Sequence, residues 1–398
     1  MASDILFALS DTGGGHRSVA LALSAGIEEL ADRRVACNID DLLYQTKFPF
    51  LKKAATYYNH LTTDYVAAYN AGFRLTDSQI RMTILAQIVY RASRRHIITT
   101  LDRFRPKLIV VTHPFLVGHL VCAARRDWKF DYRVVTVVTD PVSIHAAWCC
   151  AEVDAYIVFS DDVRAKLEHF GIPADRISIT SFPVHPDFDP EYRGKTDARR
   201  ALGISENSYT VLITGGGAGS GIAPELVQLL ENHDRIQLLV VTGDNVKLYR
   251  RLTQTSRART TRIFGRVHNM ATLMAACDIV VTKAGPSTLM EAASMNRPVV
   301  ITGAVGLQEV ANIGMALKHG IGVSCNGTAE TNEIVRGYCE QQFGGKAVHS
   351  LRIGRSEPAN ILLGEYQKAL HGALRQETEA GSSTKCGTEG LQRVEAKV

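Results

Sequence analysis

The sequence lacks the cysteine spacing that marks a metal-binding ribbon or a dithiol redox motif. Its eight cysteines include no C-x-x-C pair, and the adjacent Cys149 and Cys150 cannot easily chelate one ion together. Scattered cysteines of this kind are typical of reduced thiols in a cytosolic protein. We therefore expect reduced cysteines and no bound metal.

Long apolar runs are also missing. No stretch approaches the ~20 apolar residues that span a bilayer, so we expect no transmembrane helix. The N-terminus has no basic region ahead of the apolar run Ile5–Leu9, which has the length of a strand and ends at a glycine loop. This pattern predicts a first buried strand rather than a secretory signal.

Neither sign of charge is in strong excess. The formal net charge is +5, and hydrophobic residues make up 45% of the chain against 21% charged residues. This composition is normal for a globular protein with a buried core. The small positive excess permits an anionic partner such as a nucleotide or an acidic membrane, and we expect no nucleic-acid partner.

What the sequence does contain is a regular alternation of apolar strands and helical stretches. Continuous Val and Ile runs favour parallel sheets covered on both faces, and the alternation favours doubly wound α/β domains. The predicted helices are Ser18–Leu30, Leu51–Phe73, Ser78–Phe104 and Ile222–Glu231. The predicted strands are Ile5–Ser10, Val35–Ile39, Leu108–Thr112, Arg133–Thr139, Ala155–Phe159, Ile177–Ser181, Thr210–Thr214, Ile236–Thr242, Thr261–Phe264, Ile279–Thr282 and Pro298–Ile301.

A proline-rich, charged segment interrupts this alternation, and after it the pattern starts again. We predict a Rossmann-like domain over residues 1–183, a linker over 184–196 and a second Rossmann-like domain over 197–356. A C-terminal helix over 357–375 follows. The remaining residues, 376–398, are rich in Gly, Ser, Thr and charge, which predicts a disordered tail.

Each domain opens with a strand, a glycine loop and a helix. The loops are Asp11–His16 and Gly215–Gly221. Ligands of open α/β sheets bind beyond the carboxyl ends of the strands, and a helix start offers N–H groups that suit phosphate. A tight turn without a ligand remains the alternative for either loop taken alone.

Two familiar nucleotide motifs fit these loops poorly. The first loop has Gly13 and Gly15 but Ser18 in place of a third glycine, although Asp40 stands where a ribose-binding acid could lie. The second loop is not followed by the Lys-Ser or Lys-Thr pair of a P-loop. An oxidoreductase or a P-loop kinase is therefore disfavoured.

His16 stands at the junction of the first loop and its helix. An imidazole there can act as a general base, because its ordinary pKa lies near ~6.5, and Asp11 is close enough in sequence to orient it. The simpler interpretation of these residues alone is that His16 caps the helix or packs on the loop.

Several motifs in order resemble the monogalactosyldiacylglycerol synthases. They are Ser10–Arg17, Val137–Asp140 with His145 and Trp148, Asn269-Met270, Leu273-Met274, Cys277-Asp278, Thr282–Thr288 with Glu291-Ala292, Gln308-Glu309 and Asn312. The similarity extends from Ile5 to about Ala373. These synthases are members of glycosyltransferase family twenty-eight, with the processive diacylglycerol glucosyltransferases and the peptidoglycan lipid-II synthase.

The resemblance implies a GT-B fold, in which two Rossmann-like domains face a cleft. It implies an inverting transfer of galactose, or less readily glucose, from a UDP-sugar to the free hydroxyl of 1,2-diacylglycerol, with no cofactor and no required metal. The acceptor would lie on the first domain and the UDP-sugar on the second. The enzyme would be cytoplasmic and peripheral on the inner face of the cell membrane.

The resemblance also implies roles for single residues. His16 would be the catalytic base, with Asp11 beside it. Gly14, Gly15, His145 and Trp148 would contact the acceptor. The donor would be held by Gly215, Gly216, Gly217 and Gly219 at the diphosphate, by the helix start at Lys283, Ala284, Gly285, Ser287 and Thr288, by Glu291 at the ribose, and by Gln308, Glu309 and Asn312 around the sugar.

Three positions depart from the family pattern. Ala218 replaces a polar residue, Gly306-Leu307 replaces Pro-Gly, and Ala146 replaces a proline. The first two touch the donor site and leave galactose against glucose open. Other functions also stay open: a lipid-linked N-acetylhexosaminyl transferase, a UDP-sugar 2-epimerase of the same architecture, and a nucleotide-sugar sensor without activity.

An aromatic stripe with flanking lysines is typical of a bilayer-contacting segment. Its residues are Phe48, Phe50, Leu51, Lys52, Lys53, Ala54, Tyr58, Leu61, Tyr65, Ala68, Tyr69 and Gly72. The basic residues that follow could attract anionic lipid; they are Arg81, Arg91, Arg94, Arg95, Arg103 and Arg105. The alternative is that the stripe packs on the sheet and the charges are solvated.

Overall fold

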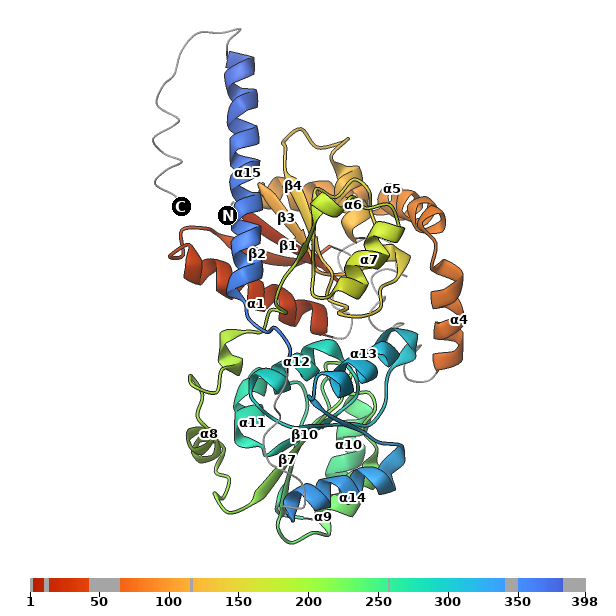
Figure 1. Cartoon of the computed structure of the whole chain (residues 1–398), viewed down its shortest axis with the longest axis vertical. Helices are drawn as coiled ribbons and strands as arrows, with labels where there is room; N and C mark the ends of the chain where they lie inside the picture. The colour runs from red at the N-terminus through yellow and green to blue at the C-terminus, as the bar shows by residue number, and fades with distance from the viewer. Residues whose placement is uncertain are drawn as a thin grey trace.

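The computed structural model describes residues 3–10, 14–42, 65–114, 117–256, 258–340 and 350–381. Two six-stranded parallel sheets form two α/β domains, one above the other in Figure 1. This is the two-domain, doubly wound arrangement that the alternation of strands and helices predicts.

The first sheet has the order β2-β1-β3-β4-β5-β6. Helices α1 and α15 pack on the face that carries Phe7, and α5 and α6 pack on the face that carries Ala8. The strands are β1 (Ile5–Leu9), β2 (Cys37–Asp41), β3 (Leu108–Val111), β4 (Arg133–Val137), β5 (Ala155–Val158) and β6 (Ile177–Ile179). The helices are α1 (Gly15–Leu30), α4 (Val66–Thr76), α5 (Gln79–Phe104), α6 (Val117–Ala124), η1 (Ala146–Trp148), α7 (Asp161–His169) and η2 (Ala174–Arg176), with α15 (Ser356–Gly381) from the end of the chain.

The second sheet has the order β12-β11-β10-β7-β8-β9. Its strands are β7 (Tyr209–Thr214), β8 (Ile236–Val241), β9 (Thr261–Phe264), β10 (Ile279–Thr282), β11 (Val299–Ile301) and β12 (Gly322–Ser324). Its helices are α8 (Lys195–Leu202), α9 (Pro224–Glu231), α10 (Val246–Thr255), α11 (Met270–Ala276), α12 (Pro286–Ser294), α13 (Gly306–Lys318) and α14 (Gly327–Cys339). Both sheets are therefore buried on two faces, as continuous apolar strands require.

Some element ends differ from the prediction for clear physical reasons. Helix α1 begins at Gly15 instead of Ser18, because Gly14 at φ 87° turns the chain and its carbonyl accepts the Ser18 N–H at 3.1 Å. Helix α9 begins at Pro224 instead of Ile222, since proline suits the first helical turn. Helix α15 continues to Gly381, where a disordered tail was expected from Gln376.

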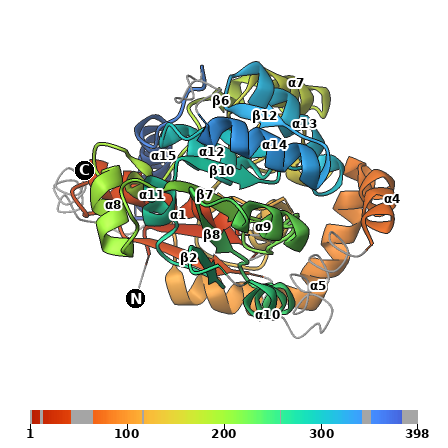
Figure 2. The same ribbon diagram turned by 90° about the horizontal axis from the view of Figure 1, so that it is seen from below.

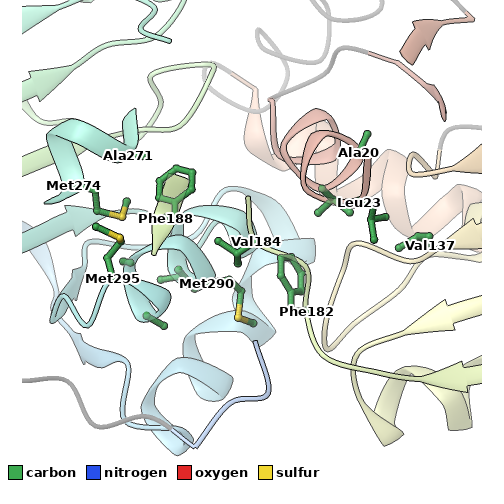
Figure 3. Close-up of a cluster of buried hydrophobic side chains, with 14 of the residues drawn as sticks. Ala20, Leu23, Val137, Phe182, Val184, Phe188, Ala271, Met274, Met290 and Met295 are labelled. Atoms are coloured by element: carbon green, nitrogen blue, oxygen red, sulfur yellow. The ribbon is translucent and has the colours of Figure 1, made fainter. Parts of the chain in front are cut away.

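The predicted linker is part of a hydrophobic core. Figure 3 shows Phe182, Val184 and Phe188 between Leu23 of α1 on one side and Met295 near the end of α12 on the other. All five side chains are buried. The segment contains η3 (Pro186–Phe188), and α8 already begins at Lys195. The prolines of this segment therefore lie in a packed connection between the two domains.

The chain returns to the first domain at its end. Helix α15 lies beside α1 in Figure 1. The hydroxyl of Tyr366 donates to Asp4 at 2.7 Å, and Arg133 Nε donates to Glu365 at 2.8 Å. Beside the linker, Phe182 pairs with Arg352 and Gly354 through backbone hydrogen bonds. Two crossings of the chain therefore join the domains.

Candidate active site

The described part of the first glycine loop, Gly14–His16, and the second loop, Gly215–Gly221, lie at the points where strand order reverses in each sheet. In the first sheet β1 lies between β2 and β3, and in the second sheet β7 lies between β8 and β10. Ligands of open α/β sheets bind at such points. A cavity of about 530 Å³ lies there, lined by Gly14, Gly15 and His16 of the first domain and by Gly215, Gly216 and Gly217 of the second.

The glycines of the second loop have different tasks. Gly216 lines the cavity in a left-handed conformation with φ 68°, so its backbone can approach a ligand closely. Gly219 stands outside the cavity lining. A Cβ there would lie 1.9 Å from the Thr242 carbonyl oxygen, so this glycine serves the packing of the loop on β8.

The loop after β10 leads into α12. Gly285 is the N-cap and has no side chain to cap the helix, so the first-turn N–H groups remain as donors for an anion. Ser287 and Thr288 line the cavity. Ala284 and Asn312 lie behind it and are buried, and Asn312 Nδ2 donates to the Ala284 carbonyl at 2.9 Å.

The loop after β10 carries a lysine that forms an ion pair. Lys283 forms an ion pair with Glu309, and both line the cavity. The second oxygen of the Glu309 carboxylate accepts the Val305 N–H at 2.9 Å. The pair places one positive and one negative group beside the start of α12, where a phosphate and a sugar hydroxyl could each find a partner.

Glu291 is a buried carboxyl on the wall of the cavity. It is 8% exposed, and burial raises its pKa from 4.5 to about 7, while a hydrogen bond from Ser18 acts in the opposite sense. The Ser18 hydroxyl of α1 donates to Glu291 Oε1 at 2.6 Å. A neutral donor of the opposite domain thus holds the carboxyl that we predicted for the ribose.

His16 lies at the start of α1 against the ends of β3 and β4. Its Nδ1 lies 2.8 Å from Thr139 Oγ1, and its ring centre lies 4.4 Å from that of His113 and 6.2 Å from that of Trp148. Burial, together with the nearby His16, holds the pKa of His113 well below its usual range. His16 is therefore oriented in the cleft beside a neutral ring. Asp11, its predicted partner, lies outside the described residues.

Asp140 is a cleft residue that the motif contained but our role assignment passed over. It follows β4 at the carboxyl edge of the sheet and lines the cavity. Its two oxygens accept from Trp148 Nε1 and Gln308 Nε2, each at 2.8 Å. Burial raises its pKa from 3.8 to about 6. The signals in the sequence were its place after a buried strand and its presence in the Val137–Asp140 motif.

His145 and Trp148 stand behind the cavity wall. Trp148 uses its indole N–H to hold Asp140. His145 Nδ1 accepts the Ala147 N–H at 3.0 Å, and its Nε2 donates to the Phe73 carbonyl at 3.0 Å. Neither residue is part of the cavity lining. The structure thus gives both residues a supporting position, and their contact with the acceptor stays a prediction.

Direct contacts close the cleft between the domains. Ser287 Oγ donates to the Gly15 carbonyl at 3.1 Å, and the Tyr69 hydroxyl of α4 donates to Gln308 Oε1 at 3.2 Å. Gly306 at the start of α13 explains one departure from the family pattern. A Cβ there would lie 2.5 Å from the Tyr69 ring, so a larger residue would push α4 away.

Comparison with known sequences identifies both halves of the chain. Residues 16–184 match the family model of monogalactosyldiacylglycerol synthase, and residues 210–304 match that of the glycosyltransferase family 28 C-terminal domain. The resemblance expected from the motifs is therefore confirmed.

Curated relatives agree at modest identity. Monogalactosyldiacylglycerol synthase 1 of Arabidopsis thaliana is 27% identical over 371 residues, which cover 89% of this chain and 68% of the relative. A probable monogalactosyldiacylglycerol synthase of Nicotiana tabacum is 28% identical over 333 residues, which cover 80% of this chain and 61% of the relative. The chain thus spans roughly two thirds of the length of these relatives.

Solved structures share the fold. UDP-GlcNAc 2-epimerase from Neisseria meningitidis has a TM-score of 0.60 at 13% identity and covers 92% of this chain and 99% of its own. WaaG, a glycosyltransferase involved in lipopolysaccharide biosynthesis, has a TM-score of 0.50 at 15% identity and covers 96% of this chain and 100% of its own. These likenesses confirm the predicted GT-B fold.

Proposed function

We propose that this chain, in which a monogalactosyldiacylglycerol synthase domain is followed by a family 28 C-terminal domain, is an inverting glycosyltransferase. It transfers galactose from UDP-galactose to the free hydroxyl of 1,2-diacylglycerol and makes a membrane glycolipid. One observation carries the proposal. A single cavity joins His16 of the first domain to the glycine loop and the α12 start of the second.

The second domain binds the donor. Gly216 and Gly217 allow the backbone to approach the diphosphate, and the N-terminus of α12 supplies roughly half a positive charge beside it. Glu291 exchanges its bond with Ser18 for the ribose hydroxyls. Fixed donors of this kind stabilise the negative charge that builds on departing UDP, so the transfer needs no metal ion.

The first domain supplies the base. In the tautomer with its proton on Nδ1, which donates to Thr139 Oγ1, His16 has Nε2 as its basic nitrogen. Nε2 takes the proton of the glycerol hydroxyl while its oxygen attacks C1 of the sugar from the face opposite UDP. The new bond to C1 forms as the bond from C1 to the phosphate oxygen breaks, and the configuration at C1 inverts.

An exposed apolar row on α5 supports a contact between the first domain and a bilayer. Ile80, Ile84 and Ile88 follow one another at four-residue spacing on α5 and are 58–75% exposed. Exposed arginines accompany them, among them Arg81 and Arg91. Apolar side chains with basic neighbours suit a membrane surface that contains anionic lipid. None of the described helices is long and apolar enough to cross a bilayer, so this surface would dock peripherally.

Helix α4 lies between this surface and the cavity. It lies beside α5 at the edge of the molecule in Figure 1 and contacts α13 of the second domain through Tyr69 and Gln308. A diacylglycerol headgroup lifted at α5 would therefore reach the cavity along α4. The predicted aromatic stripe ahead of Tyr65 lies outside the described residues.

The decisive experiment offers the protein vesicles with and without diacylglycerol, together with UDP-galactose, UDP-glucose or UDP-N-acetylglucosamine. We expect UDP release and a galactosyl lipid only with diacylglycerol and UDP-galactose. Turnover with UDP-glucose instead would place the chain with the glucosyltransferases. Conversion of UDP-N-acetylglucosamine without lipid would reveal a 2-epimerase, and no turnover with any pair would sink the proposal.

A further inference from the structure

Away from the cleft, three side chains of the first domain converge that are all common metal ligands. The thiols of Cys122 and Cys150 and the carboxylate of Glu152 offer ligand atoms that lie within 4.8 Å of one another. Cys122 is on α6, whereas Cys150 and Glu152 follow η1. The fold thus joins residues that show no metal spacing in the sequence, and the proposed transfer uses none of them.

The cluster is held in place by its surroundings. Both cysteines are free and buried. The Cys150 N–H donates to the Tyr156 hydroxyl at 2.8 Å, and that hydroxyl donates to the Cys150 carbonyl at 2.8 Å. Arg126 Nη2 lies 3.2 Å from Glu152 Oε1 and holds the carboxylate at the rim. The backbone beside Cys150 is thus held by hydrogen bonds, and the carboxylate of Glu152 lies at the exposed rim of the cluster.

A cavity opens beside these ligands, and one buried polar atom near it has no partner. The cavity measures about 430 Å³ and is lined by Cys150, Glu152 and His119. His119 precedes Cys122 by one turn of α6 and is 8% exposed, and its Nδ1 has no hydrogen-bond partner among the described residues. Unsatisfied buried polar atoms are uncommon in proteins and often mark a missing water or ion.

We propose that Cys122, Cys150 and Glu152 bind one zinc-type divalent cation, with water from the cavity as the fourth ligand. Thiolate sulfur and carboxylate oxygen together favour zinc over magnesium or calcium. Two sulfur atoms in a tetrahedral zinc site lie roughly 3.8 Å apart. The thiols of Cys122 and Cys150 therefore need to approach each other by no more than about 1 Å.

Binding exchanges two thiol protons for two metal–sulfur bonds, and the protons pass to solvent without any transfer of electrons. The ion would tie α6 to the segment after η1. That segment follows directly on Trp148, the last residue of η1, whose indole N–H donates to Asp140 in the cleft. The cation is thus a structural clamp behind the cleft wall, and it is independent of which sugar or lipid the enzyme uses.

The test uses the reduced, metal-stripped full chain titrated with Co²⁺ and, separately, Zn²⁺. We expect a thiolate-to-cobalt charge-transfer band that saturates at one ion per chain, displacement of cobalt by zinc, and a higher Tm with zinc. Cys150→Ser should abolish the band, and Glu152→Gln, at an exposed position, should weaken binding at least tenfold. Cys37→Ser, which removes a thiol elsewhere in the same domain, should change neither.

Three results would overturn the site. They are no charge-transfer band in the wild-type chain, a band unaffected by both Cys150→Ser and Glu152→Gln, and equal loss of the band in Cys37→Ser. Glu152→Gln keeps the test valid if Cys150→Ser does not fold, because its side chain lies at the surface. Since each readout is metal binding, failure of the galactosyltransferase proposal would leave the result unaffected.

Discussion

At the residue scale, the cleft is unusual in how it holds its carboxyl groups. Glu291 accepts from a serine hydroxyl, and Asp140 accepts from an indole N–H and an amide. Neither receives a hydrogen bond from a cation in these contacts, so burial dominates and raises the pKa of each toward neutrality. A carboxyl group with a pKa near neutrality can lose its negative charge, which suits the proposed binding of anionic UDP.

His16→Ala should stop transfer and leave UDP binding nearly unchanged. The base and the donor site lie on different domains, and a general base typically contributes about 10²–10⁴-fold to a rate. The measurements are kcat with diacylglycerol vesicles and the UDP Kd by calorimetry. Glu291→Gln is the matched control, in which UDP affinity should fall instead. A His16→Ala chain that loses UDP affinity would show that the domain roles are assigned wrongly.

At the scale of single elements, α5 combines a buried and an exposed apolar row. Met82, Ala86 and Tyr90 are buried against the first domain, while Ile80 and Ile84 on the other side face out. A helix that only covered a sheet would carry polar residues there. This exposed row is the observation on which the proposed contact with a membrane surface rests.

Replacing Ile80, Ile84 and Ile88 together by Gln should reduce vesicle binding by at least tenfold. Each fully buried isoleucine contributes about 1.5–3 kcal/mol, and even partial insertion of three exceeds the ~1.4 kcal/mol of a tenfold change. Vesicle sedimentation gives the partition, and calorimetry should show unchanged UDP binding. Leu229→Gln, at an exposed leucine of the second domain, is the control and should leave both unchanged.

The arginines beside this row should make the binding to vesicles dependent on salt. Vesicle binding of the wild-type chain should weaken as ionic strength rises, since exposed charges are screened within about 10 Å at 0.1 M salt. Binding that resists both the isoleucine replacements and high salt would remove α5 from the membrane contact.

At the scale of the whole molecule, the domains are joined in two ways. A continuous apolar core runs through Phe182, Val184 and Phe188 (Figure 3). Across the cleft the described residues form polar contacts, among them Ser18 with Glu291 and Gln308 with Asp140. Seen from below in Figure 2, α4 and α13 approach each other at the edge of the molecule. The domains are therefore held together by an apolar junction and by polar contacts that a ligand could replace.

The pH dependence of the free energy of unfolding should reveal the raised pKa of Glu291. Its folded pKa of about 7 lies above the ordinary 4.5, so the folded chain binds the proton more tightly than the unfolded chain. Stability then falls as pH rises from about 4.5 to about 7. Relative to Glu291→Gln, the free energy of unfolding of the wild type should fall by on the order of 3 kcal/mol between pH 4.5 and pH 8.

Denaturant unfolding of both chains at several pH values without nucleotide measures this difference. Glu206→Gln, at an exposed carboxylate, is the control and should give a difference that does not change with pH. A flat difference for Glu291→Gln would mean that this carboxyl is not desolvated in the folded chain.

The sequence by itself determined the α/β class, the succession of strands along the chain and the two glycine loops. These features follow from local periodicity and backbone freedom. It also carried the resemblance to the monogalactosyldiacylglycerol synthases, since motifs such as Lys283–Thr288 keep their order along the chain. Element ends were displaced by a few residues at Gly14 and Pro224, where capping geometry decides the start of a helix.

Only the tertiary structure decided which side chains meet. Asp140 and Gln308, or Cys122 and Cys150, come from separate elements, and no local pattern fixes their distance. The tertiary structure also moved His145 and Trp148 behind the cavity wall and gave Gly219 a packing role, since both outcomes depend on how loops stack. The physical reason is the same throughout: periodicity reports which face of an element is apolar, while contacts between elements depend on the global packing.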